Sequence, residues 1–164
     1  MMKIRIKFRK YGTMKFIGHL DVMRYFQKAI RRSEVNIRYS EGFSPHQVMS
    51  VAAPLGVGIT SKGEYVDIEV LDTENSKKMI DRLNAVMSEG FEILEYKLLP
   101  DDAANAMSIV AAADYSLVFR PGYEPEKESP EEWFEKLVRF FDADHVMIMK
   151  KTKKGEREMD LKPF

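Results

Sequence analysis

The sequence contains no cysteine, and this absence removes several classes of chemistry at once. Without a thiolate the chain cannot form a disulfide, a cysteine-ligated zinc site, an iron–sulfur cluster or a covalent cysteine intermediate. Long apolar runs are also missing, since no stretch approaches the roughly 20 residues that a transmembrane helix needs. The N-terminus, MMKIRIKFRK, lacks the apolar stretch of a signal peptide. We therefore expect a cytoplasmic protein that does not contact a membrane.

The composition is that of a folded globular chain. Of its 164 residues, 45% are hydrophobic and 32% are charged. A chain of this size buries roughly 70% of the surface that its unfolded form exposes, so it holds a core without covalent cross-links. The length suits one ordinary domain or two small halves.

The formal net charge of +0 hides an asymmetry along the chain. Residues 1–50 hold eleven Lys/Arg against three Asp/Glu, residues 51–149 hold nine against twenty, and residues 150–164 hold six against three. The three segments therefore carry +8, −11 and +3. A basic N-terminal segment indicates an anionic partner such as RNA. The alternative is that basic and acidic strands lie side by side and neutralise each other.

Hydrophobic periodicity predicts a ferredoxin-like unit over residues 1–100. Alternation of apolar and charged residues predicts strands, and apolar residues at helical spacing predict helices. The predicted order is strand 3–9, helix 18–33, an extended segment 36–53 interrupted by a loop, strand 64–70, helix 76–88 and strand 91–99. This β-α-β-β-α-β order is that of the split βαβ motif, with two helices on one face of a four-stranded sheet. The predicted fold class is α+β.

The pattern restarts after an Ala-rich segment, residues 101–113, which we interpret as a connector or a short helix. A strand over 115–120, a helix from 129 to 141 and a hairpin over 145–161 then predict a second, incomplete ferredoxin-like unit, β-α-β-β, over 114–164. Ser129, Pro130 and Glu132 have the spacing of a capping box with proline at the first helical position.

The predicted second unit lacks the last helix and strand of a complete one. A hairpin that ends in Pro163-Phe164 would leave an unfinished sheet edge. We therefore expect the chain to be a piece of a longer protein rather than a chain with an abbreviated second half.

No catalytic motif of high specificity is present, and histidines are the weak candidates. His19 opens the first predicted helix and His46 ends the loop that follows it. Two converging imidazoles would suit general acid–base cleavage of a phosphodiester, and with Asp21 they would suit a divalent metal. The more common roles are a helix N-cap neighbour for His19 and a loop-ordering residue for His46. We predict no metal site and no cofactor.

The cations of residues 3–9 share one face of the first predicted strand. One interpretation is a basic sheet surface that binds a nucleic-acid backbone. The alternative is cross-strand pairing, because Tyr65, Asp67 and Glu69 point to the same face of the neighbouring third strand. We prefer pairing for this strip alone.

The first predicted helix and the loop after it add further candidates. Helix cations would bind phosphates, and aromatic rings in the loop Tyr39–His46 would stack on bases. The ordinary alternatives are a solvated helix face and a Phe43 side chain that packs the loop onto the core. The candidate RNA-binding or partner-binding residues are Arg5, Arg9, Arg24, Lys28, Arg31, Arg32, Arg38, Tyr39, Ser40, Gly42, Phe43, Pro45 and His46.

Four motifs in order carry a resemblance to a known family. They are Gly18-His19-Leu20-Asp21 with Arg24, Tyr39-Ser40-Glu41-Gly42-Phe43-Ser44-Pro45-His46, Ala53-Pro54-Leu55-Gly56-Val57-Gly58 and Gly63-Glu64-Tyr65. This run resembles the radical-SAM-linked bacterial family of unknown function over about residues 3–120. The resemblance implies a radical SAM enzyme as partner, because members occur free or fused behind such an enzyme. The layout is also similar, in architecture alone, to CRISPR repeat-processing RNA endonucleases.

Three hypotheses for the function follow. The preferred one is a non-catalytic RNA-binding or adaptor domain that serves a radical SAM enzyme. The second is a metal-independent endoribonuclease that uses His19 and His46. The third is a protein-interaction module that docks a partner through its acidic middle segment without RNA.

Overall fold

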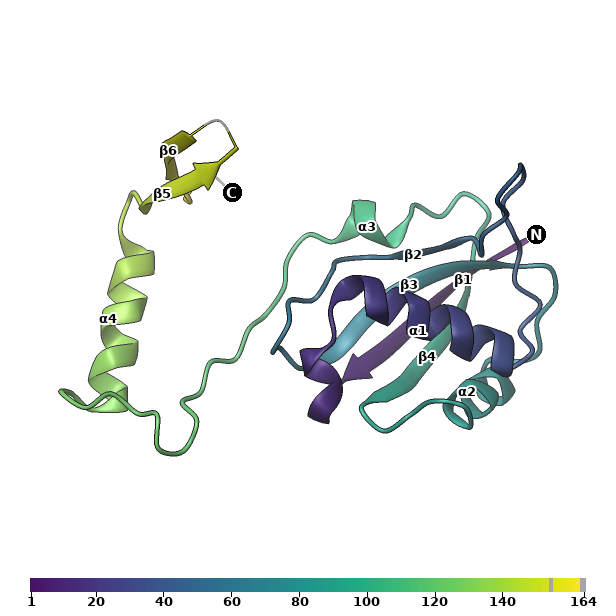
Figure 1. The fold of residues 1–164 in the computed structure, drawn as a ribbon, viewed down its shortest axis with the longest axis horizontal. Helices are drawn as coiled ribbons and strands as arrows, with labels where there is room; N and C mark the ends of the chain where they lie inside the picture. The colour runs from purple at the N-terminus through teal and green to yellow at the C-terminus, as the bar shows by residue number, and fades with distance from the viewer. Residues whose placement is uncertain (154, 163–164) are drawn as a thin grey trace. The chain divides into compact units, whose positions relative to one another are not determined.

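The computed structural model describes residues 1–153 and 155–162 and is a mixed α/β structure (Figure 1). Its described residues form a four-stranded antiparallel sheet, a two-stranded sheet and four α-helices. The chain divides into two compact units, Met1–Ala113 and Asp114–Phe164. Among the described residues, no helix is both long and apolar enough to cross a membrane.

The first unit contains the four-stranded sheet, with β1 as a central strand. The elements are β1 (Met2–Lys10), a 3-10 helix η1 (Gly12–Phe16), α1 (His19–Arg32), β2 (Met49–Val51), β3 (Ser61–Val70), α2 (Ser76–Asn84), β4 (Phe91–Leu99) and α3 (Ala106–Ile109). The strand order is β2-β3-β1-β4, and all neighbours are antiparallel. The prediction of a four-stranded sheet with helices is confirmed.

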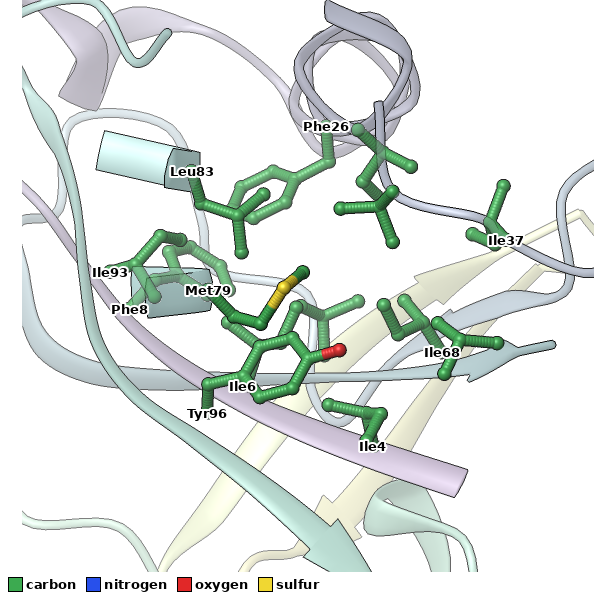
Figure 2. Close-up of a cluster of buried hydrophobic side chains, with 14 of the residues drawn as sticks. Ile4, Ile6, Phe8, Phe26, Ile37, Ile68, Met79, Leu83, Ile93 and Tyr96 are labelled. Carbon is green, nitrogen blue, oxygen red and sulfur yellow. The ribbon is translucent and has the colours of Figure 1, made fainter. Parts of the chain in front are cut away.

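Side chains from α1 and α2 pack against one face of this sheet and form the core (Figure 2). Ile4, Ile6 and Phe8 of β1 are buried beneath these helices. The rings of Phe8 and Phe26 lie 4.6 Å apart between their centroids. The alternating apolar residues of β1 therefore supply the buried face that the sequence predicted.

The opposite face of the sheet is crossed by the connector that follows β4. Lys3 Nζ donates hydrogen bonds to the carbonyl oxygens of Asp101, at 2.6 Å, and Ala103, at 3.2 Å. The backbone N–H of Ala106 donates to Asp67 Oδ2 at 2.7 Å. The Ala-rich segment thus contains the short helix α3 and is held on the sheet by polar contacts.

The second unit contains α4 (Pro130–Asp142) and a hairpin of β5 (Met147–Thr152) and β6 (Gly155–Asp160). The Ser129 side chain accepts a hydrogen bond from Glu132 N, and the Glu132 carboxylate accepts one from Ser129 N. This reciprocal capping box confirms the predicted start of the helix. Lys154, within the predicted turn, and the Pro163-Phe164 end lie outside the described residues.

One predicted strand is wrong, and one predicted extended segment forms a strand only in part, at Met49–Val51. The strand expected at 115–120 does not form, and Leu117 and Val118 are exposed. A strand needs a neighbour that pairs its N–H and C=O groups, and no strand among the described residues pairs with this one. Phe119 instead packs its ring against Trp133, with centroids 5.1 Å apart. The extended segment at 36–39 makes only isolated bridges, from Ile37 to Val70 and from Tyr39 to Gln47.

Phe26 is the aromatic residue on which the core packing can be tested, because its side chain is only 2% exposed. Phe26→Ala should lower the free energy of unfolding by about 3–5 kcal/mol, since it removes a buried ring and leaves a cavity. Phe16→Ala, at a position that is 59% exposed, should change it by less than about 0.5 kcal/mol. Urea unfolding followed by circular dichroism measures both. Equal effects of the two substitutions would contradict this account of the core.

Asp160 makes the hairpin unit sensitive to acid. Its pKa is lowered from 3.8 to about 2, chiefly by the hydrogen bond with His145 Nδ1 and then by the backbone N–H groups of Lys162 and Val146. Because folding lowers this pKa, the contacts stabilise the hairpin above pH 3.8 and lose that effect as the pH falls toward about 2. An NMR titration of the Asp160 carboxyl carbon should give the lowered pKa, and His145→Ala should raise it. A wild-type midpoint at 3.8 would contradict the prediction.

Candidate nucleic-acid interface

The cations of β1 are largely neutralised by carboxylates of the neighbouring strands. Arg5 binds Asp67 in a bidentate manner, with Nε–Oδ1 at 2.8 Å and Nη2–Oδ2 at 2.9 Å. This contact also raises the pKa of Arg5. The cross-strand ion pairs on this face are Arg5–Asp67, Lys7–Glu95 and Arg9–Glu92. The prediction of cross-strand pairing is confirmed for Asp67 of β3, whereas the two carboxylates on β4 were not among the predicted partners. The sheet face therefore offers little uncompensated positive charge.

Arg38 is also paired with a carboxylate, that of Glu69 on β3. Its Nη1 lies 2.6 Å from Glu69 Oε2, and its backbone N–H donates to the Glu69 carbonyl oxygen at 2.8 Å. A groove of about 300 Å³ opens on this side of the sheet, with Lys3, Asp67 and Glu69 among its lining residues. All three of these charged residues contact the protein's own groups: Lys3 the connector, Asp67 the guanidinium of Arg5, and Glu69 that of Arg38. The groove therefore presents charges of both signs rather than a basic surface.

The outward face of α1 is different, because its cations are exposed and mostly without carboxylate partners. Arg24 pairs with Asp21 at 3.3 Å, and both side chains are largely in solvent. Arg31 and Arg32 donate instead to backbone carbonyl oxygens, of Gln27 at 3.4 Å and Val86 at 3.0 Å. Within the described part of the chain, Lys28, Arg31 and Arg32 form no ion pair. The exposed cations of this face are Arg24, Lys28, Arg31 and Arg32.

The loop of residues 39–47, here called the 39–47 loop, is closed by hydrogen bonds between its two ends. Ser40 N donates to the His46 carbonyl oxygen at 2.8 Å, and His46 N donates to Ser40 Oγ at 3.1 Å. Ser40 Oγ and His46 Nδ1 lie 2.8 Å apart. Gly42 has a φ of 108°, in the left-handed region that glycine adopts readily. His46 thus orders the loop, which is the ordinary role considered for it.

Phe43 lies at the tip of this loop and exposes 112% of its reference surface. Figure 1 shows the loop as a narrow projection, drawn in dark blue at the upper right. The alternative in which Phe43 packs the loop onto the core is therefore wrong. Tyr39, at the base of the loop, is also exposed. The loop carries two solvent-facing aromatic rings.

Gln47 joins the 39–47 loop to α1. Its Nε2 donates to the carbonyl oxygen of Gln27 at 3.2 Å and lies 3.5 Å from the Tyr39 hydroxyl. The same Gln27 oxygen accepts the hydrogen bond from Arg31 Nε. One carbonyl of α1 therefore holds both the loop and a cation of the helix. Gln47 therefore attaches the base of the loop to α1. The exposed cations of α1 and the 39–47 loop are together called the basic corner.

Sequence reasoning missed Gln47 as a positioning residue. Its side chain is only 6% exposed, although it follows a polar loop. Its partner on α1 is a backbone carbonyl, which no residue pattern identifies. The only signal in the sequence was its position directly after the loop Tyr39–His46, which carries several candidate residues.

His19 lies in another environment, at the start of α1. It lines a cavity of about 10 Å³ together with Lys10 and Glu64. Lys10 is 1% exposed and donates to the carbonyl oxygen of Ile17 at 3.0 Å, and burial lowers its pKa. A volume of this size holds about one water molecule. Three of the four recognised motifs contribute lining residues here, and the buried Lys10 was not singled out in the sequence.

The structure does not bring His19 and His46 together. The 39–47 loop is attached at Gln27, which lies eight residues along α1 from His19, or about 12 Å at the helical rise. His46 is hydrogen-bonded within its own loop, whereas His19 faces Lys10 and Glu64. In the part of the chain that is described, no group of three His, Cys, Asp or Glu residues could hold a metal ion.

Comparison with known proteins assigns the chain to a family. One family profile, described as "Uncharacterized protein conserved in bacteria (DUF2344)", matches residues 3–164. A search of curated proteins gave no match. The family description names no activity and no radical SAM enzyme, so that partner remains a prediction. The chain belongs to the DUF2344 family of uncharacterized proteins conserved in bacteria.

Proposed function

We propose that this protein binds RNA without catalysing its cleavage, and that it does so through the basic corner. The observation that carries the proposal is the run of exposed cations on α1 beside the two exposed rings of the 39–47 loop. Cations bind the phosphate backbone and aromatic rings bind bases, so this combination is typical of RNA-binding surfaces.

Electrostatics favours the basic corner over the sheet. On β1 the guanidinium groups of Arg5 and Arg9 already bind carboxylates, and a phosphate would have to compete with Asp67 and Glu92. On α1 the cations are solvated, so a phosphate replaces water and releases counterions from the RNA. From Arg24 to Arg32 the helix rises about 12 Å, enough for several contacts along one strand.

The adaptor part of the proposal concerns a partner enzyme. The resemblance to the radical-SAM-linked family implies that the partner is a radical SAM enzyme. The chain has no cysteine to hold an iron–sulfur cluster, so in this proposal the partner supplies the chemistry and this protein presents RNA.

The ferredoxin-like interpretation of residues 1–100 belongs to the same proposal. The antiparallel strand order β2-β3-β1-β4 supports it, as does the packing of α1 and α2 on one face of the sheet. In this interpretation the second unit is an incomplete copy, with a helix and a hairpin in place of a full sheet.

Charge reversal tests the RNA-binding surface. The double substitution Lys28→Glu with Arg31→Glu should weaken binding of end-labelled total RNA by at least about tenfold. It should also reduce the slope of log K against log salt by about 0.7 for each phosphate group that the variant no longer binds. Filter binding between about 50 mM and about 200 mM salt measures both quantities.

A matched control makes the same change of charge elsewhere. Lys62→Glu with Lys77→Glu alters two exposed lysines on β3 and α2, outside the basic corner. This control should bind RNA nearly as well as the wild type. An equal loss in both double variants would contradict the placement of the site. A wild-type protein that binds no RNA even at low salt would overturn the proposed function.

A further inference from the structure

We propose that the RNA bound at the basic corner is an unpaired strand, and that Phe43 selects it by stacking on one of its bases. This inference rests on the proposed function and deepens it, because it names the class of RNA. It predicts that the protein prefers single-stranded RNA to duplex RNA and tolerates different base sequences.

The Phe43 side chain does not pack within the protein. Its side chain exposes 112% of its reference surface, whereas Phe16, also on the surface, exposes 59%. Phe16 has Lys15 Nζ 5.0 Å from its ring centroid. Among the described residues, no ring or cation contact reaches Phe43. The Phe43 ring therefore adds nothing to the core and has both faces open to a ligand.

The loop that carries Phe43 is closed at its base. The bonds between Ser40 and His46 close the loop on either side of Phe43, and Gln47 fixes the loop to α1. A loop that is ordered before binding loses less conformational entropy when a ligand arrives. Closure of the loop therefore limits the backbone freedom that Phe43 loses when a base stacks on its ring.

A phenyl ring has no hydrogen-bond donor or acceptor, so Phe43 cannot read the edge of a base. Its attraction to a nucleotide is stacking, which needs a free base face. In a duplex each interior base is already stacked on its neighbours, whereas bases in single strands and loops can be splayed out onto aromatic side chains. Phe43 therefore gains a contact with unpaired RNA that duplex RNA does not offer.

Gln47 and Arg31 share the carbonyl oxygen of Gln27, so the base of the loop lies against the helix that carries the cations. A strand whose base stacks on the loop can extend its backbone along the helix. Tyr39, exposed at the base of the loop, offers a second ring to the same strand.

The experiment compares three probes with the full chain by fluorescence anisotropy. They are a labelled RNA of twelve nucleotides without self-complementarity, the same sequence as a blunt RNA duplex, and the same sequence as single-stranded DNA. We expect the RNA strand to bind at least tenfold tighter than the duplex. Tighter binding of the DNA strand than of the RNA strand would overturn RNA as the ligand.

Substitutions at position 43 measure the contribution of the phenyl ring to RNA binding. Phe43→Ala should weaken binding of the RNA strand by about 5-fold to about 150-fold, the range that corresponds to removal of one stacked base. It should leave duplex binding unchanged, because that binding depends on the cations. Phe43→Trp should bind the RNA strand about as tightly as the wild type, since indole also stacks. Phe16→Ala, the matched removal of another exposed phenyl ring, should have no effect.

The outcomes separate this inference from the proposed function. Equal affinity for strand and duplex, or an unchanged affinity in Phe43→Ala, overturns the inference even if RNA binds and charge reversal on α1 weakens it. An equal loss of strand and duplex binding in Phe43→Ala also overturns it, because the ring would then act on the structure of the loop. Absence of binding to all probes overturns the proposed function itself.

Discussion

The antiparallel pairing of β1 with β3 on one edge and β4 on the other is the constraint on which the first unit depends. Its register places Arg5 opposite Asp67 on β3, and Arg9 opposite Glu92 on β4. Because side chains alternate along a strand, the same register turns Ile4 and Ile6 toward α1 and α2. A one-residue slip would expose the apolar row and bury the cations. One pairing therefore sets both the core and the charge of the exposed face.

This pairing changes the meaning of the basic N-terminal segment. Residues 1–50 carry +8, but Arg5, Lys7 and Arg9 of β1 contact carboxylates. Lys3 donates to the connector after β4, which lies on the same face. The cations of α1 escape this neutralisation because they lie on the side of the helix that faces away from the sheet. They lie next to the 39–47 loop, which Gln47 holds against the helix. The exposed cations of α1 are thus where positive charge of the N-terminal segment remains mostly without carboxylate partners.

The parts of the fold that depend on local patterns could be predicted from the sequence. Alternation of apolar and charged residues identified β1, and the capping-box spacing of Ser129 and Glu132 identified the start of α4. Both signals lie within a few neighbouring residues. The strand expected at 115–120 failed because a strand also needs a partner, which alternation does not supply. At the site, the motif placed Phe43 in a loop, but its exposure and the contact of Gln47 with a backbone carbonyl depend on tertiary packing.

The central claim is that the basic corner, rather than the sheet face, receives the RNA. An NMR titration of the isotope-labelled full chain with a single-stranded RNA of twelve nucleotides tests it directly, because every backbone amide reports its own surroundings. The account predicts that the largest shifts fall in residues 24–32 and 39–47. Shifts concentrated on β1, β3 and β4, or in Asp114–Phe164, would contradict it.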